Sequence, residues 1–313
     1  WYYYMKKNLS NIKKGKYYLD KNECIGIPTE TVYGLAANAY SDEATSKIFK
    51  LKKRPKNNPL IVHYANLNDL KKDCELNKNF YKLYKQFCPG PITFVLKLKN
   101  DSKISKNVTN KKKTLAVRFP KHKITLGLLK KINYPLAAPS ANISTKISAV
   151  SLGDVKEEFG NKLKFILNGG RSKIGLESTI ISLVAKPEIL RLGGMQISVL
   201  CKALGLKLKY NILKKTLHPG QGKLHYSPDI PIRLNANNPR LGEAFILIKK
   251  RKKNDKNFFY LTKNKNLKEA AKNLYKTLRK IKKLGYKKIN VAKIPSRKIG
   301  VAINDRLKKA AYN

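Results

Sequence analysis

Four arginines in the first 200 residues are the first candidates for chemistry in this chain. The sequence holds 68 lysine and arginine residues, of which only ten are arginine, and the four are Arg54, Arg118, Arg171 and Arg191. A chain this rich in lysine has little need of arginine for positive charge alone. We expect arginine where a planar, permanently charged fork must grip a carboxylate or phosphate through two hydrogen bonds. These positions therefore predict anion-binding sites.

Five segments combine polar groups with tight-turn residues directly after expected strands, which is where open α/β sheets bind ligands. They cover residues 28–35, 52–63, 114–120, 138–144 and 175–180. Each segment alone also fits an ordinary strand end. Ser140 is better placed to form a hydrogen bond than to act as a nucleophile, because no histidine or acid is spaced to activate it. His63, at the end of a strand, equally fits a buried structural histidine.

The elements that must position these groups alternate along the chain. From residue 23 to 204, short apolar runs alternate with helical patterns, which favours an α/β fold. Strands are expected at 24–27, 60–63, 92–97, 115–119, 136–138, 164–167, 179–183 and 189–192. A helix with Asp42 as its N-cap should deliver Lys52 and Arg54 at its end, just before Pro55 stops it.

A second, smaller α/β unit follows a segment rich in proline and glycine. Residues 214–228 lack periodicity, which indicates a structured connecting strap. Strands are expected at 244–248, 258–261 and 288–292, and a long helix between Asn266 and Gly285.

The net charge of +49 would ordinarily suggest a polyanionic partner such as RNA. Here lysine is spread along the whole chain with many asparagines and isoleucines, a pattern that AT-rich codon usage also produces. Both readings stay open, and weak RNA binding with strong salt dependence is the expectation.

The composition also indicates the cellular compartment in which the protein occurs. The four cysteines form no CxxC pair, and histidines do not cluster, so neither a zinc site nor a disulfide framework is expected. No apolar run is long enough to span a membrane, and the first residues lack the pattern of a signal peptide. We expect a cytoplasmic protein with no membrane partner.

Taken together, the five segments resemble the YrdC-like family of threonylcarbamoyl-AMP synthases. The hallmark of that family is KxR followed far downstream by SxN, here Lys52, Arg54, Ser140 and Asn142. The resemblance runs from about residue 25 to 200, and residues 222–228 and 301–311 are similar to its long, two-domain form. It implies a twisted mixed sheet around a basic cavity in a catalytic domain at 12–204. It further implies a linker strap over the active site at 205–229 and a small Rossmann-like domain at 230–313.

The resemblance also implies a reaction. Such enzymes condense L-threonine, bicarbonate or CO2, and ATP into L-threonylcarbamoyladenylate and pyrophosphate. The product supplies a downstream tRNA threonylcarbamoyl transferase complex that modifies the adenosine next to the anticodon. The threonine amine attacks the carbon source, and the resulting carboxylate displaces pyrophosphate, so protein should contribute mainly alignment and charge stabilisation. Mg²⁺ should arrive with ATP, held by phosphates and water rather than by protein ligands.

The family's functional positions map onto this chain residue by residue. The catalytic set is Lys52, Arg54, Ser140 and Asn142. The ATP-binding set is Arg54, Asn58, Thr114, Ser140, Ser148, Arg191 and Tyr226. The threonine-binding set is Thr31, His63, Arg118, Ala138 and Ser178. Glu30 and Glu177 are the nearest acidic groups, and neither is assigned to a metal. Arg171 has no counterpart in the family pattern.

Two other functions remain as alternatives. One is a non-catalytic RNA-binding module that uses the basic cavity of the same fold. The other is the carbamoyl-adenylate chemistry of hydrogenase maturation, which usually occurs in a larger chain with acylphosphatase-like and zinc-finger parts. Neither part is visible in this sequence.

Overall fold

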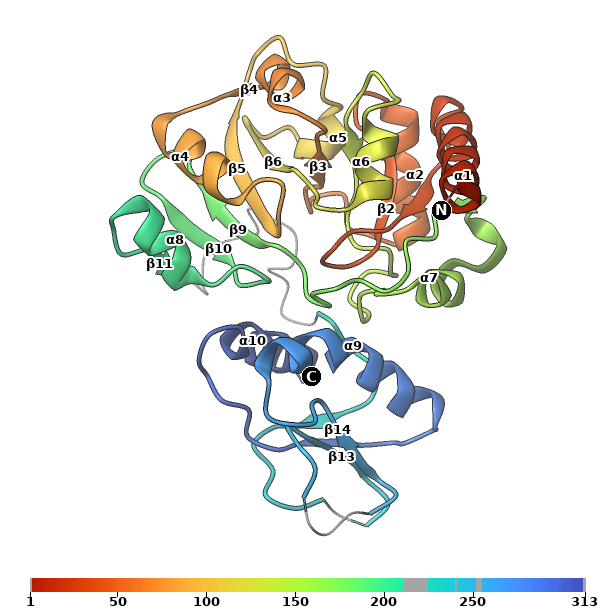
Figure 1. Ribbon diagram of the computed structural model, residues 1–313, viewed down its shortest axis with the longest axis vertical. Helices are drawn as coiled ribbons and strands as arrows, with labels where there is room; N and C mark the ends of the chain where they lie inside the picture. The colour runs from red at the N-terminus through yellow and green to blue at the C-terminus, as the bar shows by residue number, and fades with distance from the viewer. Residues whose placement is uncertain (1, 211–224, 240, 252–254, 312–313) are drawn as a thin grey trace.

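The chain folds around two β-sheets, each covered by helices (Figure 1). The structure is a computed structural model and describes residues 2–210, 225–239, 241–251 and 255–311. The described part forms an 11-stranded sheet and a 4-stranded sheet. One cluster of buried apolar side chains extends from the first sheet into the helices of the second unit, so the two units share a core.

The large sheet is mixed, and its strand order is β11-β10-β9-β5-β6-β3-β7-β2-β1-β8, with β4 paired to β5. Its strands are β1 Ile25–Ile27, β2 Gly34–Asn38, β3 Ile61–His63, β4 Cys74–Glu75, β5 Ile92–Leu98, β6 Thr114–Arg118, β7 Leu136–Ala137, β8 Phe165–Ile166, β9 Thr179–Ser182, β10 Glu188–Arg191 and β11 Lys209–Tyr210. Its helices are α1 Tyr2–Asp20, α2 Asp42–Lys52, α3 Leu67–Asp73, α4 Lys78–Phe87, α5 Lys106–Thr109, α6 Lys123–Leu129, α7 Leu152–Phe159 and α8 Ile197–Leu204, with a 3-10 turn at Gly160–Lys162.

The predicted strands of this unit all occur, with ends shifted by at most one residue. β2 was not predicted, because its residues are glycine, alanine, leucine and asparagine, which favour strands weakly. The prediction of Asp42 as the N-cap of α2 is wrong. Ser41 caps the helix by accepting a hydrogen bond from the Ala44 amide, and Asp42 is the first helical residue.

Strand pairing brings separated polar residues into one row. Arg118, the last residue of β6, is paired with His63 of β3 on one side and with Thr93 of β5 on the other. Directly paired residues project from the same face of a sheet. The three side chains therefore lie side by side although they come from three segments.

The second unit is built on a parallel sheet with the order β12-β15-β13-β14. Its elements are β12 Ile232–Arg233, β13 Ala244–Leu247, β14 Phe258–Tyr260, α9 Leu267–Lys283, β15 Ile289–Val291 and α10 Gly300–Ala310. The predicted long helix begins as expected, since the Asn266 side chain caps it by accepting hydrogen bonds from the Lys268 and Glu269 amides. β12 was not predicted because two residues carry no periodic signal.

Helices α9 and α10 face the large unit (Figure 1). Most of the predicted strap, residues 211–224, lies outside the described residues. After this segment, Ser227 forms a β-bridge with Lys146, and Asp229 makes an ion pair with the same lysine. The chain that leads into the second unit is therefore bound to the loop after β7.

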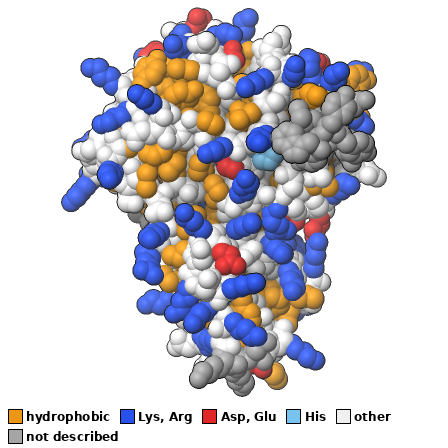
Figure 2. Space-filling view, viewed as in Figure 1, with side chains coloured by type: hydrophobic (Ala, Val, Ile, Leu, Met, Phe, Trp, Pro, Cys, Tyr) orange, Lys and Arg blue, Asp and Glu red, His pale blue; other side chains and the backbone are white. Residues whose placement is uncertain are grey.

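Positive side chains are spread over both units on the face shown in Figure 2, rather than collected in one patch. Within the described ranges, no helix is both long and apolar enough to cross a bilayer.

Candidate active site

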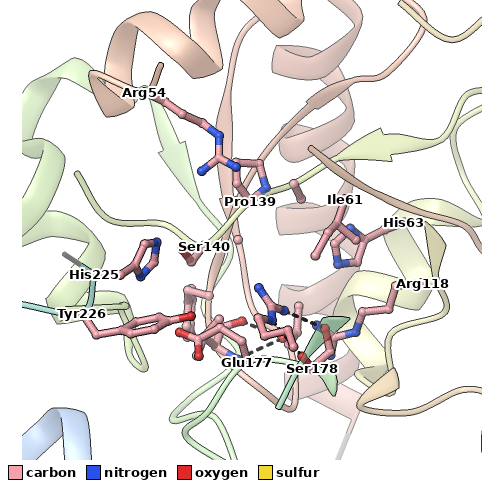
Figure 3. Close-up of a pocket in the computed structure, with 16 residues that line it drawn as sticks. Arg54, Ile61, His63, Arg118, Pro139, Ser140, Glu177, Ser178, His225 and Tyr226 are labelled. Atoms are coloured by element: carbon pink, nitrogen blue, oxygen red, sulfur yellow. Dashed lines mark hydrogen bonds between the residues drawn. The ribbon is translucent and has the colours of Figure 1, made fainter. Parts of the chain in front are cut away.

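A cavity opens between the large sheet and the chain segment that begins at His225 (Figure 3). Eight residues singled out from the sequence line it: Arg54, His63, Arg118, Ala138, Ser140, Ser178, Arg191 and Tyr226. The sheet thus gathers groups from at least six separate segments around one space.

Arg54 enters the cavity from the end of α2, as Figure 3 shows. Its guanidinium is held from behind, since Nε donates to the Asn58 carbonyl at 3.1 Å and Nη2 donates to the Pro59 carbonyl at 2.9 Å. Burial and the nearby Arg191 lower the pKa of Arg54 to about 9. A buried arginine beside another cation is a site that an anion would stabilise.

Lys52 has a different position from Arg54, although only one residue separates them. Its ammonium is buried and donates to the backbone carbonyls of Ser140, at 2.5 Å, and Asn142. Burial, with a smaller contribution from Arg54, lowers the pKa of Lys52 well below its usual range. Lys52 therefore ties the KxR segment to the SxN loop.

Asn142 holds the same loop from inside. Its side-chain amide donates to the carbonyls of Ile143, at 2.7 Å, and Lys146, at 2.9 Å. Ser140, two residues earlier, pairs with Gly34 of β2 and lines the cavity. Asn142 therefore stabilises the loop, whereas Ser140 lines the cavity.

Arg118 and His63 form the opposite wall. Arg118 Nη2 lies 2.8 Å from the Glu30 carboxylate, and both side chains are almost fully buried. Arg118 Nε and His63 Nδ1 have no hydrogen-bond partner among the described residues. Burial and the adjacent Arg118 lower the pKa of His63 to about 3, so the imidazole is neutral at pH 7. This wall therefore carries the Arg118 guanidinium, which is paired with Glu30, and the neutral imidazole of His63.

Arg191 and Ser178 lie between these walls. Arg191 Nε donates to the Ser178 carbonyl at 3.0 Å, and Nη2 donates to the Ser178 hydroxyl at 3.1 Å. That hydroxyl also shares a hydrogen bond of 2.7 Å with Thr93. Burial lowers the pKa of Arg191. A third buried guanidinium therefore faces the same cavity as Arg54 and Arg118.

Tyr226 and His225 close the side toward the second unit (Figure 3). Tyr226 has a φ of 63°, a left-handed conformation that non-glycine residues seldom adopt. Its ring stacks on Tyr275 with centroids 6.0 Å apart, and the Arg306 guanidinium lies 4.7 Å from the ring centroid. The Tyr226 hydroxyl is buried without a hydrogen-bond partner in the described part of the chain. Packing against the second unit thus holds this hydroxyl at the cavity.

Comparison with known proteins agrees with this geometry. Residues 17–193 match the family model described as "Telomere recombination", and residues 195–312 match "Threonylcarbamoyl-AMP synthase, C-terminal domain". The chain is 34% identical to the threonylcarbamoyl-AMP synthase of Pyrococcus abyssi, over 94% of this chain and 92% of that protein. It belongs to the threonylcarbamoyl-AMP synthase family.

Two further relatives support the assignment to this family. The threonylcarbamoyl-AMP synthase of Bacillus subtilis is 33% identical, over 94% of this chain and 90% of that protein. The crystal structure of P. abyssi Sua5 complexed with L-threonine superposes with a TM-score of 0.88 at 32% identity, over 96% of this chain and 94% of that one. The predicted family and the predicted fold class, a YrdC-like mixed sheet with a second α/β domain, are confirmed.

Six of the residues predicted from the synthase family do not line the cavity: Lys52, Asn142, Asn58, Thr114, Ser148 and Thr31. Lys52 and Asn142 organise the loop, as described above. Thr31 is fully buried and bonds to Thr29, a lining residue, at 2.8 Å. Ser148 donates to Glu177 at 2.5 Å.

The remaining two predicted positions lie further from the centre. Asn58 supports Arg54 through its carbonyl, and its side-chain oxygen is buried without a partner. Thr114 lies at the start of β6, whereas Arg118 lies at its end. Four residues of strand separate them by about 13 Å. The nucleotide role of Thr114 stays a prediction, and Arg171 is exposed.

Three groups of the site were missed in the residue-by-residue prediction, and a fourth, Glu177, was noted only as a nearby acidic group without an assigned role. Glu177, His225, Tyr275 and Arg306 all take part in the wall or its support. His225 directly precedes Tyr226 in the motif that marked the long form of the synthases, so its signal was available. The other three form one cluster across the two units, which spacing along the sequence could not reveal.

The acidic residues of the cavity are already paired. Glu30 is held by Arg118 and by the Lys121 amide, and Glu177 is held by Arg306. Among the residues that the structure describes, no group of three or more metal-ligating side chains could hold an ion. The expectation that Mg²⁺ arrives with ATP stays a prediction.

Proposed function

We propose that this chain is a threonylcarbamoyl-AMP synthase, which condenses L-threonine, bicarbonate or CO2, and ATP into L-threonylcarbamoyladenylate and pyrophosphate. One observation carries the proposal. Three buried guanidinium groups, those of Arg54, Arg118 and Arg191, converge on one cavity in a chain that matches both domains of this family. A triphosphate and an amino-acid carboxylate are anions that such a cavity could hold.

Arg54 and Arg191 would bind the nucleotide. Their positive charges lie within electrostatic range of each other, so a ligand with several negative charges would relieve their repulsion. Ser140, which lines the same cavity, would donate or accept a neutral hydrogen bond. The unpartnered Tyr226 hydroxyl would complete the nucleotide contacts.

Arg118 and His63 would bind threonine. Glu30 holds one nitrogen of Arg118, and the unpartnered Nε would be directed to the threonine carboxylate. His63, kept neutral by burial, would offer a hydrogen bond without repelling the threonine amine. Ser178 and the Ala138 carbonyl lie on the same cavity wall and would serve the amine and hydroxyl.

In the reaction, the threonine amine would attack the carbon of CO2 and release a proton, or attack the carbon of bicarbonate with loss of water, to form a carbamate. The carbamate oxygen would then attack the α-phosphorus of ATP, and pyrophosphate would leave. Mg²⁺ bound to the phosphates would supply charge neutralisation. The chain itself would align the two substrates and stabilise negative charge through its arginines.

We extend the proposal to the biological setting. The product would be used by a tRNA threonylcarbamoyl transferase complex, and the reaction would take place in the cytoplasm. The four cysteines are free thiols, which fits a reducing compartment. Weak, salt-sensitive RNA binding by the cationic surface is compatible with this role.

Pyrophosphate release measured with ATP, L-threonine and bicarbonate tests the proposal. Release should require all three substrates, and turnover of ATP without threonine would contradict the function. Tight RNA binding combined with no threonine-dependent nucleotide binding would instead favour the RNA-binding module.

A further inference from the structure

Glu177 is a buried carboxylate whose main partners come from the second unit. The side chain is 4% exposed. Arg306 Nε of α10 donates to it at 2.8 Å, and the Tyr275 hydroxyl of α9 donates to it at 3.1 Å. From the large unit, the Ser148 hydroxyl donates at 2.5 Å. The charge of Glu177 is therefore balanced across the boundary between the units.

The carboxylate lies next to the nucleotide arginine. Glu177 directly precedes Ser178, and Arg191 makes two hydrogen bonds to Ser178. Glu177 and Arg191 also interact electrostatically and line the same cavity. Burial alone would raise the pKa of Glu177, but Arg306 and then Arg191 outweigh it and hold the pKa at about 2. The negative charge of Glu177 is thus stabilised by the guanidinium groups of Arg306 and Arg191.

Arg306 forms its ion pair with Glu177 from outside the cavity. It is 1% exposed, its Nη2 donates to the Leu192 carbonyl at 2.6 Å, and its Nη1 contacts Asp305 at 2.6 Å. These contacts hold Arg306 at the back of the wall. If Arg306 were absent, Glu177 would be a buried charge without its principal partner, and the attraction of Arg191 for it would grow.

We propose that Arg306 is a positioning residue: by pairing with Glu177 it keeps Arg191 directed at the anionic ligand, so nucleotide binding depends on docking of the second unit. The proposal rests on the proposed function only in taking the ligand of Arg191 to be a nucleotide. Coupling between two equilibria is reciprocal. Nucleotide binding should therefore strengthen docking of α9 and α10 by the same factor.

The experiment is a double-mutant cycle on the full chain, with ATP binding measured by titration calorimetry. The four proteins are the parent chain, Arg306→Met, Glu177→Gln and the double variant. Arg306→Met should weaken ATP binding by about tenfold, within the usual range of coupling between sites. The double variant should bind ATP more tightly than Arg306→Met alone, because no unpaired carboxylate then competes for Arg191.

Arg279→Met is the matched control. Arg279 of α9 is also a buried arginine that crosses between the units, where it contacts Glu158 at 2.8 Å and the Ile147 carbonyl at 2.7 Å. It does not line the cavity. Loss of this ion pair should lower the thermal stability of the protein but leave ATP affinity close to that of the parent chain.

Arg306→Lys serves as a second variant in case Arg306→Met does not fold. Lysine keeps the charge, so ATP affinity should remain closer to that of the parent chain than in Arg306→Met. The proposal is overturned if Arg306→Met binds ATP as the parent does, or if the double variant binds no better than Arg306→Met. If the parent chain binds ATP but releases no pyrophosphate, the proposed function fails while the cycle still tests the coupling.

Discussion

Replacing Lys52 with methionine should abolish most of the activity without removing a direct contact to substrate. The Lys52 ammonium spans two carbonyl groups of the SxN loop, those of Ser140 and Asn142. A hydrogen bond from a charged donor contributes about 1.5–3 kcal/mol, so the pair contributes about 3–6 kcal/mol. Part of this is offset because methionine avoids the cost of burying a charge.

If most of the remaining loss falls on the transition state, kcat/KM for pyrophosphate release should decrease by about 10² to 10⁴, since about 1.4 kcal/mol is a factor of ten. Lys162→Met is the control, because Lys162 is exposed and such changes usually stay within about 0.5 kcal/mol. Circular dichroism should show that Lys52→Met is folded. A folded Lys52→Met protein with more than about a tenth of the parent kcat/KM would refute the role of this lysine in holding the loop.

Three further outcomes are expected. Arg118→Lys should raise KM for threonine by about 10- to 100-fold with a smaller change for ATP, because one charged hydrogen bond of about 1.5–3 kcal/mol is lost; equal changes in both KM values would contradict the assignment. The melting temperature should fall as pH decreases from 6.5 to 3, because the unfolded chain binds protons at His63 and His225 that the folded chain, with pKa values of about 3, does not. His63→Gln should make that fall shallower, and an unchanged slope would count against a neutral buried imidazole. Removal of Mg²⁺ with a chelator should stop pyrophosphate release, whereas release that persists would mean that the protein's own cations suffice.

Much of the large unit could be predicted because its signals are local. Apolar runs of three to six residues marked the strands, and their ends carried the polar groups that line the cavity. Even in this unit, the spacing of residues along the sequence did not determine where their side chains point. Lys52 and Arg54 were both predicted at the end of one helix, but their side chains point to different places. The left-handed conformation of Lys53, with φ of 49°, ends the helix so that Lys52 contacts the loop while Arg54 enters the cavity.

The support from the second unit could not be predicted from spacing. Glu177 and Arg306 are separated by 129 residues, and both fit solvated positions when each is considered alone. Tyr275 is a buried residue of α9, and its hydroxyl donates a hydrogen bond to Glu177. Only the packing of α9 and α10 against the large unit determines these partners.

The separation of Glu177 from Arg306 also has a consequence for synthesis of the chain on the ribosome. Elongation at about 5–20 residues per second places about 6–26 s between the two residues, which are 129 positions apart. During that interval the nascent large unit holds a carboxylate whose guanidinium partner has not been made. Water must solvate Glu177 until then, so the cavity wall of the nascent chain stays hydrated and becomes dry only when α10 has been translated and has packed against it.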